Sequence, residues 1–264
     1  MWFFQRRSAF LNQKVLPRWN RDRLHDYVLL PASNGFVTRR ECFFVSHFWR
    51  SSDDPDPDGE FLRRFQKALR SERWSYIWVD WTCVPQAPRS YLEARYFVRS
   101  LETVGGLIRN CTFIWFYPPF EPRLWILYEI AEYFLTCEGP EPPQDDIREF
   151  YQHIGEMKVR SVDYVLSKYG YRCKNDLDRR FLTTRLELLI LMDKLNFDTS
   201  WKRLVFDDLT WHTTTSRLAI ALDGLLEIDK FEGTFDYAGQ VWNFTPFPRW
   251  NSLFGTTVTT LPHE

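Results

Sequence analysis

Glu129 is the acidic residue whose neighbours most favour chemistry. It lies in the run PRLWILYEIAEYF, and on a helix Trp125 and Tyr133 lie four residues to either side of it. A carboxylate among aromatic rings is partly desolvated, which raises its pKa, and it can stabilise positive charge that develops on a bound molecule. Glu129 and Glu132 can equally be ordinary acids on the water-facing side of an amphipathic helix. The elements around this helix decide between the two roles.

Three short apolar runs, at residues 42–47, 76–81 and 111–117, have the composition of buried strands. Apolar residues at helical spacing follow the first two runs, at 60–71 and 91–109. This β-α-β-α-β-α order predicts an α/β fold, with a parallel sheet and helices on both faces. Ligands of such sheets bind at the carboxyl ends of the strands.

The loops that leave these strand ends begin at His47, Trp81 and Tyr117. Ser46 either contacts a ligand or bonds the backbone where its strand ends. His47 either orients a substrate or is a satisfied core residue. Asp80 either faces the crevice or caps the next turn. The sequence therefore predicts that these side chains share one sheet edge with the helix that carries Glu129.

The three strand ends, FVSHFW, VDWTCVPQ and WFYPPFEPRLWILYE, together resemble a TIR-type domain. In that family the first strand typically ends in Ser followed by Tyr, Phe or His, as Ser46 and His47 do in FVSHFW. The helix after the third strand carries a Trp and, four residues later, a Glu, a spacing that Trp125 and Glu129 share. The stretch VDWTCVPQ also resembles the fungal heterokaryon-incompatibility domain, a TIR-like relative. The resemblance covers residues 40–138 and implies a TIR-like or flavodoxin-like sheet.

The resemblance implies that the chain cleaves NAD between nicotinamide and ribose, with Glu129 as the catalytic residue. The ribose becomes oxocarbenium-like in that reaction, and one carboxylate can stabilise it. The leaving group is already a pyridinium, so no general acid is required, unlike in ordinary glycosidases. NAD is then a substrate, and neither a metal nor a cofactor is expected. The resemblance also implies self-association and a role in immunity or cell death.

Side-chain chemistry adds further candidates for the pocket. We expect Ser46, His47 and Asp80 to shape it. The rings of Trp49, Trp81 and Trp125 are candidates for stacking on nicotinamide or adenine. Arg50 or Arg123 can bind a pyrophosphate bidentately.

Two alternatives remain open. A non-enzymatic module can use the same fold to assemble a signalling complex, and it predicts an exposed Glu129 with no concave site beside it. An enzyme acting on another nucleotide keeps the pocket and changes the substrate.

Composition limits the other classes of function. Of the 264 residues, 44% are hydrophobic and 18% aromatic, with 12 Trp, so a full core is expected and some rings belong to a pocket or an interface. A net charge of -1 favours neither nucleic acid nor an anionic membrane. No run of 18 apolar residues predicts a membrane span. Five scattered cysteines without a CxxC pair indicate free thiols in a reducing compartment, the cytoplasm.

The chain divides by pattern into three parts: an N-terminal arm at 1–37, the α/β domain at 38–196 and a helical and irregular extension at 197–264. The arm is either docked peripherally or, by its lack of acids before Asp22, a transit peptide. The later elements we expect are strands at 149–157 and 170–173, helices at 162–170, 176–195, 201–210 and 214–229, and an irregular tail from Phe231.

The loop SSDDPDPDG contains Asp54, Asp56 and Asp58 at the spacing that opens a calcium loop. Position twelve of that loop requires an acid, and here it is Phe65. The sequence therefore favours Asp56 or Asp58 as the cap of the next helix.

Overall fold

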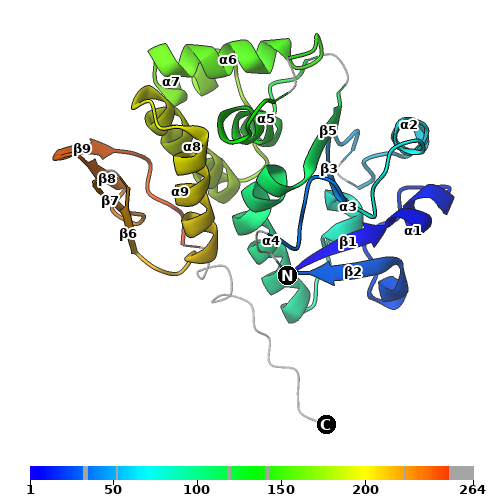
Figure 1. Ribbon diagram of the computed structural model, residues 1–264. Helices are drawn as coiled ribbons and strands as arrows, with labels where there is room; N and C mark the ends of the chain where they lie inside the picture. Colours follow the sequence, from blue (N-terminus) through cyan, green and yellow to red (C-terminus); the bar gives the residue numbers. More distant parts are fainter. Residues whose placement is uncertain (32–34, 52, 118–119, 141–142, 223, 250–264) are drawn as a thin grey trace.

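The computed structural model describes residues 1–31, 35–51, 53–117, 120–140, 143–222 and 224–249, and it is a mixed α/β structure with two sheets (Figure 1). A five-stranded sheet has the order β2-β1-β4-β3-β5, and a four-stranded sheet has the order β6-β7-β8-β9. The strands of the first sheet are β1 Trp2–Arg6, β2 Tyr27–Leu30, β3 Cys42–His47, β4 Tyr76–Val79 and β5 Thr112–Phe116. Those of the second are β6 Arg217–Ala221, β7 Leu225–Asp229, β8 Thr234–Tyr237 and β9 Gln240–Asn243.

The centre of the first sheet is parallel, because β3 pairs in parallel with both β4 and β5. The three predicted strands are therefore confirmed, except that the second ends at Val79 and its last two predicted residues, Asp80 and Trp81, begin α3. The N-terminal arm, expected at the periphery, instead contributes β1, which pairs antiparallel with β4 and β2. Trp2 and Phe4 on β1 are buried, so burial of these side chains and ladder hydrogen bonds hold the arm in the sheet.

The helices are α1 Arg7–Asn12, α2 Glu60–Leu69, α3 Asp80–Cys83, α4 Tyr91–Asn110, α5 Leu124–Thr136, α6 Arg148–Val159, α7 Val162–Lys168, α8 Asp176–Lys194 and α9 Thr199–Trp211, with a 3-10 segment η1 at Arg21–Asp26.

Helices cover both faces of the parallel strands, as the sequence predicts. Side chains of a strand alternate between faces, and in β3 Phe43 and Val45 join a core that includes residues of α1 and α2. Cys42 and Phe44 join the core on the other face, with α4 and α5. Two cores therefore enclose β3, which has no exposed residue.

The start of α2 is capped by an aspartate of the acidic loop. Asp56 accepts hydrogen bonds from the backbone N–H groups of Phe61 and Leu62, each at 2.9 Å, which satisfies two donors that a helix start leaves free. The predicted capping role is confirmed, and Asp56 is buried.

Four predictions for the later part of the chain are wrong. Residues 149–157 belong to α6 rather than to a strand, and 170–173 form only an isolated bridge between Arg172 and Arg123. The expected helix at 214–229 is the β6–β7 hairpin, and the expected irregular tail contains β8 and β9. The predicted helices at 162–170, 176–195 and 201–210 correspond to α7, α8 and α9. The sequence also predicts that Pro118 and Pro119 end the third strand, and these two residues lie outside the described part of the chain.

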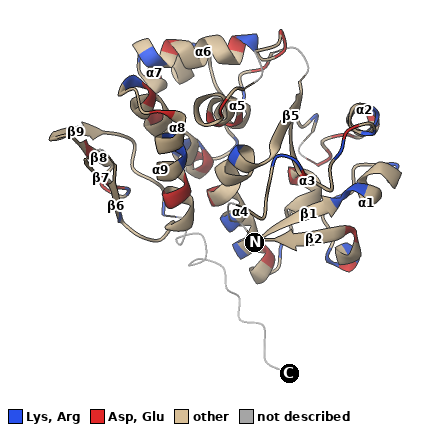
Figure 2. Ribbon diagram, viewed as in Figure 1, with Lys and Arg blue, Asp and Glu red and all other residues tan. Residues whose placement is uncertain are grey.

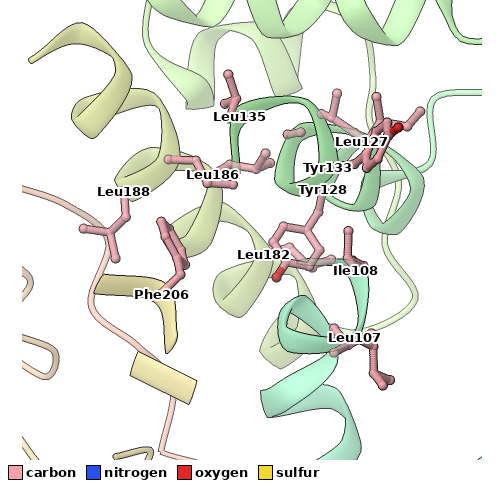
Figure 3. Packing of buried hydrophobic residues seen from close by; sticks show 14 of the residues in the cluster. Leu107, Ile108, Leu127, Tyr128, Tyr133, Leu135, Leu182, Leu186, Leu188 and Phe206 are labelled. Carbon is pink, nitrogen blue, oxygen red and sulfur yellow. The ribbon is translucent and has the colours of Figure 1, made fainter. Parts of the chain in front are cut away.

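Helix α5 lies between the sheet and the helices that follow it, in contact with α4, α6, α8 and α9. Figure 3 shows the side chains of α4, α5, α8 and α9 packed together, among them Leu127, Leu182 and Phe206, which are buried. The four-stranded sheet lies beside α8 and α9, on the side of the molecule away from β1 and β2 (Figure 1). The position of α5 is therefore fixed from both sides.

Charged residues are interspersed over the helices, while β5 carries none (Figure 2). Among the helices that the structure describes, none is long and apolar enough to cross a membrane. The five cysteines are free thiols.

Candidate functional site

The end of β3 sends Ser46 and His47 to opposite faces of the sheet, because neighbouring side chains of a strand alternate. Ser46 shares the α5 face, and its Oγ donates a hydrogen bond to Glu129 Oε2 although the two residues are 83 apart in the sequence. The hydroxyl of Tyr117, directly after β5, donates to Ser46 Oγ at 2.7 Å. Strand ends and α5 thus bring three polar side chains into one hydrogen-bonded chain.

These three hydrogen-bonded side chains lie where the topology of the sheet reverses. The connection from β3 to β4 passes through α2 on one face, and the connection from β4 to β5 passes through α4 on the other. The order β4-β3-β5 therefore leaves a crevice at the carboxyl ends of β3 and β5, the usual ligand site of such sheets. The pairing of Ser46 with Trp115 and of His47 with Phe116 sets both strand ends at the same height.

Burial dominates the electrostatics of Glu129. Desolvation raises its pKa to about 8, the nearby charge of Asp80 adds to the rise, and the hydrogen bond from Ser46 opposes it. Burial also raises the pKa of Tyr117 well above its ordinary value, with Glu129 as the next contribution. Glu129 is only partly buried by surface area, so water and small ions still have access to it. Near neutral pH it holds a proton that a positive charge nearby would release.

On the other face, Asp80 organises a second cluster. His47 Nε2 lies 3.1 Å from Asp80 Oδ1, and the indole N–H of Trp49 donates to Oδ2 at 2.7 Å. A carboxylate only accepts, so the ring hydrogen of His47 is on Nε2. The backbone N–H of Trp81 also donates to Asp80, at 2.6 Å. Asp80 therefore both begins the short α3 helix and fixes the indole of Trp49.

His47 is buried, and its ring stands edge-on to Phe61 and Phe65 of α2. Its Nδ1 has no hydrogen-bond partner among the described residues. This placement supports a structural and orienting role for His47 through Asp80.

A cavity of about 820 Å³ opens beside these clusters. Its walls come from the loop after β3, the start of α2, the loop after β5 and the segment that leads into α6. The lining residues are Phe48, Trp49, Arg50, Glu60, Phe61, Arg64, Tyr117, Phe120, Glu121, Arg123, Asp145, Asp146 and Glu149.

Of the predicted residues, Trp49, Arg50 and Arg123 line this cavity. Glu129 is not part of the lining described. Tyr117 lines the cavity, and its hydroxyl bonds Ser46, which in turn bonds Glu129. Tyr117 and Ser46 therefore connect the cavity to the carboxyl group.

Two predicted stacking rings point elsewhere. The indole N–H of Trp125 lies 3.3 Å from Asp178 of α8, and its ring stands edge-on to Tyr128. Trp81 is buried and stands edge-on to Trp49 at 5.2 Å between ring centroids. Neither is among the residues lining the cavity, so the geometry gives Trp49 the aromatic wall and leaves the other two as support.

Glu132, which we expected on a water-facing surface as one alternative, is fully buried. It forms an ion pair with Arg109, and its second carboxyl oxygen lies 3.9 Å from Arg185 of α8. Arg109 also pairs with Asp207 of α9 at 2.6 Å. The surface role for Glu132 is wrong, because this face of α5 is covered by α4, α8 and α9 and buried charges need partners.

Sequence reasoning missed several residues of the cavity. Tyr117 had a signal, since it directly follows the third strand at the ligand-binding edge. Asp145 and Asp146 had none, because they lie in the Pro-rich stretch EGPEPPQDD, and Glu149 had none, because it falls in the expected strand at 149–157. The helix that contains Glu149 brings them to the cavity only through its packing on α5.

Comparisons with protein-family models, with curated proteins and with solved structures each found no match to this chain.

Proposed function

We propose that the chain is a TIR-like enzyme that cleaves the bond between nicotinamide and ribose in NAD, with Glu129 as the catalytic carboxylate. The observation that carries the proposal is the contact between Ser46 and Glu129. This contact joins the end of β3 to α5, two elements that carry the resemblance, at the crevice of a parallel sheet. The free thiols suit a reducing compartment, which we take to be the cytoplasm.

The reaction needs little from the protein beyond one placed charge. The bond between ribose C1′ and the pyridinium nitrogen breaks, and its electron pair stays with nicotinamide, which leaves neutral. The ribose carries the positive charge, which the Glu129 carboxylate stabilises. Water then adds to C1′ and releases a proton, so the products are nicotinamide, ADP-ribose and H⁺.

The raised pKa of Glu129 suits this chemistry in one specific way. Desolvation raises the pKa because the carboxylate has little water around it, so the ionised form interacts strongly with a cation placed next to it. The cationic pyridinium of the substrate therefore favours release of the Glu129 proton to solvent on binding, and the carboxyl group takes a proton back when the products leave. Glu129 then stays ionised while the positive charge moves from the pyridinium ring to the ribose.

Tyr117 controls the approach to Glu129 in this proposal. Its hydroxyl donates a hydrogen bond to Ser46, and the residue lines the cavity. A substrate ribose hydroxyl can replace the tyrosine hydroxyl on Ser46 once the ring turns away. Tyr117→Phe keeps the ring and removes this bond, so we expect substrate affinity to change more than the chemical step.

The alternative of a non-enzymatic assembly module required an exposed Glu129 with no concave site beside it. The half-buried carboxylate and the neighbouring cavity favour the enzyme. An enzyme for another nucleotide remains compatible with the same site, so the assay must offer several.

The test is release of nicotinamide from NAD by the purified chain over a range of protein concentrations, because the proposal includes self-association. We expect Glu129→Gln to lower kcat/KM by about 100- to 1,000-fold, the effect of losing one placed electrostatic group. The matched control is Glu227→Gln, an exposed acid of β7. Equal rates in the wild type and Glu129→Gln would reject the assignment of this residue. Intact NAD at every protein concentration, alongside turnover of another nucleotide, would redirect the proposal to that substrate.

A further inference from the structure

The cavity favours positive charge more than its three arginines suggest. Arg50 bonds Asp58 and Glu60, both at 2.5 Å, and Arg64 lies 2.5 Å from Glu60. Arg123 pairs with Glu121 at 3.3 Å. Because each guanidinium already has a carboxylate, none is free to take a phosphate without breaking an ion pair.

Carboxylates outnumber guanidinium groups in the lining by five to three. The excess lies at the α6 end. There Asp145 pairs with Arg148, and Asp146 accepts from the indole of Trp115 at 3.2 Å. Among the described residues, none forms an ion pair with Glu149. This wall therefore keeps uncompensated negative charge facing the cavity.

Aromatic faces in the same cavity already hold cations. The guanidinium of Arg123 lies over Phe48 at 5.2 Å from the ring centroid, and that of Arg50 lies over Phe61 at 4.6 Å. These are cation–π distances, in which the electron-rich ring face attracts positive charge. The rings of Trp49, Tyr117 and Phe120 also line the cavity. Aromatic walls and surplus carboxylates together form the usual environment for an organic cation.

We propose that the cavity binds a flat organic cation of the pyridinium type, at the wall formed by Tyr117, Phe120 and the acids of the α6 end. The preference for positive charge follows from the cavity, and the identification of the cation as a pyridinium rests on the proposed function. The inference deepens that function, because it assigns the ring to a subsite and makes its charge the main determinant of recognition.

One ring in three charge states gives the sharpest test. 1-Methylnicotinamide, methylated on the ring nitrogen, is a cation, nicotinamide is neutral and nicotinate is an anion, and the three have nearly the same shape. Isothermal titration calorimetry of the intact chain measures each dissociation constant without any cleavage. We expect the cation to bind about tenfold more tightly than the neutral ring, the scale of one desolvated cation–π contact, and the anion to bind most weakly.

The variant Glu149→Gln removes one charge from an exposed position, so folding is not at risk. It should reduce the cation preference several-fold and leave the affinity for neutral nicotinamide unchanged. Glu227→Gln, far along the chain on β7, should leave both affinities unchanged. Equal binding of the three rings, tightest binding of nicotinate or no binding of 1-methylnicotinamide at millimolar concentration would overturn the inference.

The binding series and the cleavage assay can fail separately. Cleavage of NAD without a cation preference leaves the proposed function standing and rejects this subsite. A cation preference without cleavage of any nucleotide supports the subsite and rejects the enzyme.

Discussion

Replacing Glu129 by glutamine tests the physical premise of the site without any substrate. The pKa of this carboxyl is about 8 in the folded chain and 4.5 for an ordinary glutamate. Between these pH values the folded state holds a proton that the unfolded chain has released. The stability that this group contributes is therefore full below pH 4.5 and is lost as pH rises through 8. Glutamine has nearly the same shape and does not titrate.

The size of the effect follows from the pKa difference. Each pH unit inside this window lowers the free energy of unfolding by up to about 1.4 kcal/mol. Because Glu129 is only partly buried, we expect a loss of about 2 kcal/mol from this group between pH 6 and 8. All other titrating groups are shared by the wild type and Glu129→Gln, so they cancel in the difference. The altered hydrogen bond to Ser46 also changes the free energy of unfolding of the variant, by an amount that does not depend on pH.

Urea unfolding at pH 6.0, 6.5, 7.0, 7.5 and 8.0 measures this difference. The variant should gain on the wild type by about 2 kcal/mol across the series, while Glu227→Gln should run parallel to the wild type. Parallel curves for Glu129→Gln and the wild type would mean that the carboxyl titrates in its ordinary range. Its desolvation, and the charge argument for catalysis, would then be refuted.

The remaining predictions concern the helices that hold α5. Glu132→Gln should lower the free energy of unfolding by about 3 kcal/mol, because it leaves the buried Arg109 short of a partner. Thermal denaturation measures this loss, and an unchanged Tm would contradict the role of the ion pair. Gly105→Ala should cost about 1 to 3 kcal/mol, because the added Cβ would lie 2.5 Å from Arg185 Nη2. Gly155→Ala, a helical position with no heavy atom within 4 Å of the new Cβ, should instead stabilise by about 0.5 to 1 kcal/mol, so equal effects at the two glycines would show that packing at position 105 is not tight.

Local pattern was sufficient for the three parallel strands and for α2, but not for β1 and β2 of the N-terminal arm. The apolar runs that became β3, β4 and β5 are short and β-rich, and the amphipathic stretch that became α2 follows a capping aspartate. Each of these signals acts over a few residues, and no distant contact was needed to interpret it.

Two of the wrong predictions, the strand at 149–157 and the helix at 214–229, overlooked patterns that the sequence contains. In α6, Phe150, His153, Ile154 and Met157 are buried at helical spacing, which is the pattern of a helix rather than of a strand. In β6 and β7 the buried residues alternate, on either side of the Asp-Gly dipeptide at 223–224. Alternation around Asp-Gly is a strong hairpin signal, and it should have been preferred to a long helix.

The pattern of apolar residues along the chain is enough to assign the order of the parallel strands and helices, and the helix that carries Glu129. The environment of that carboxyl group depends on contacts between distant parts of the chain. Ser46 approaches it across 83 residues, and its burial raises its pKa. Glu132, three positions later on the same helix, instead forms an ion pair with Arg109. The physical reason is that pKa and solvation depend on every element packed around a group, whereas strand and helix patterns depend mainly on neighbours along the chain.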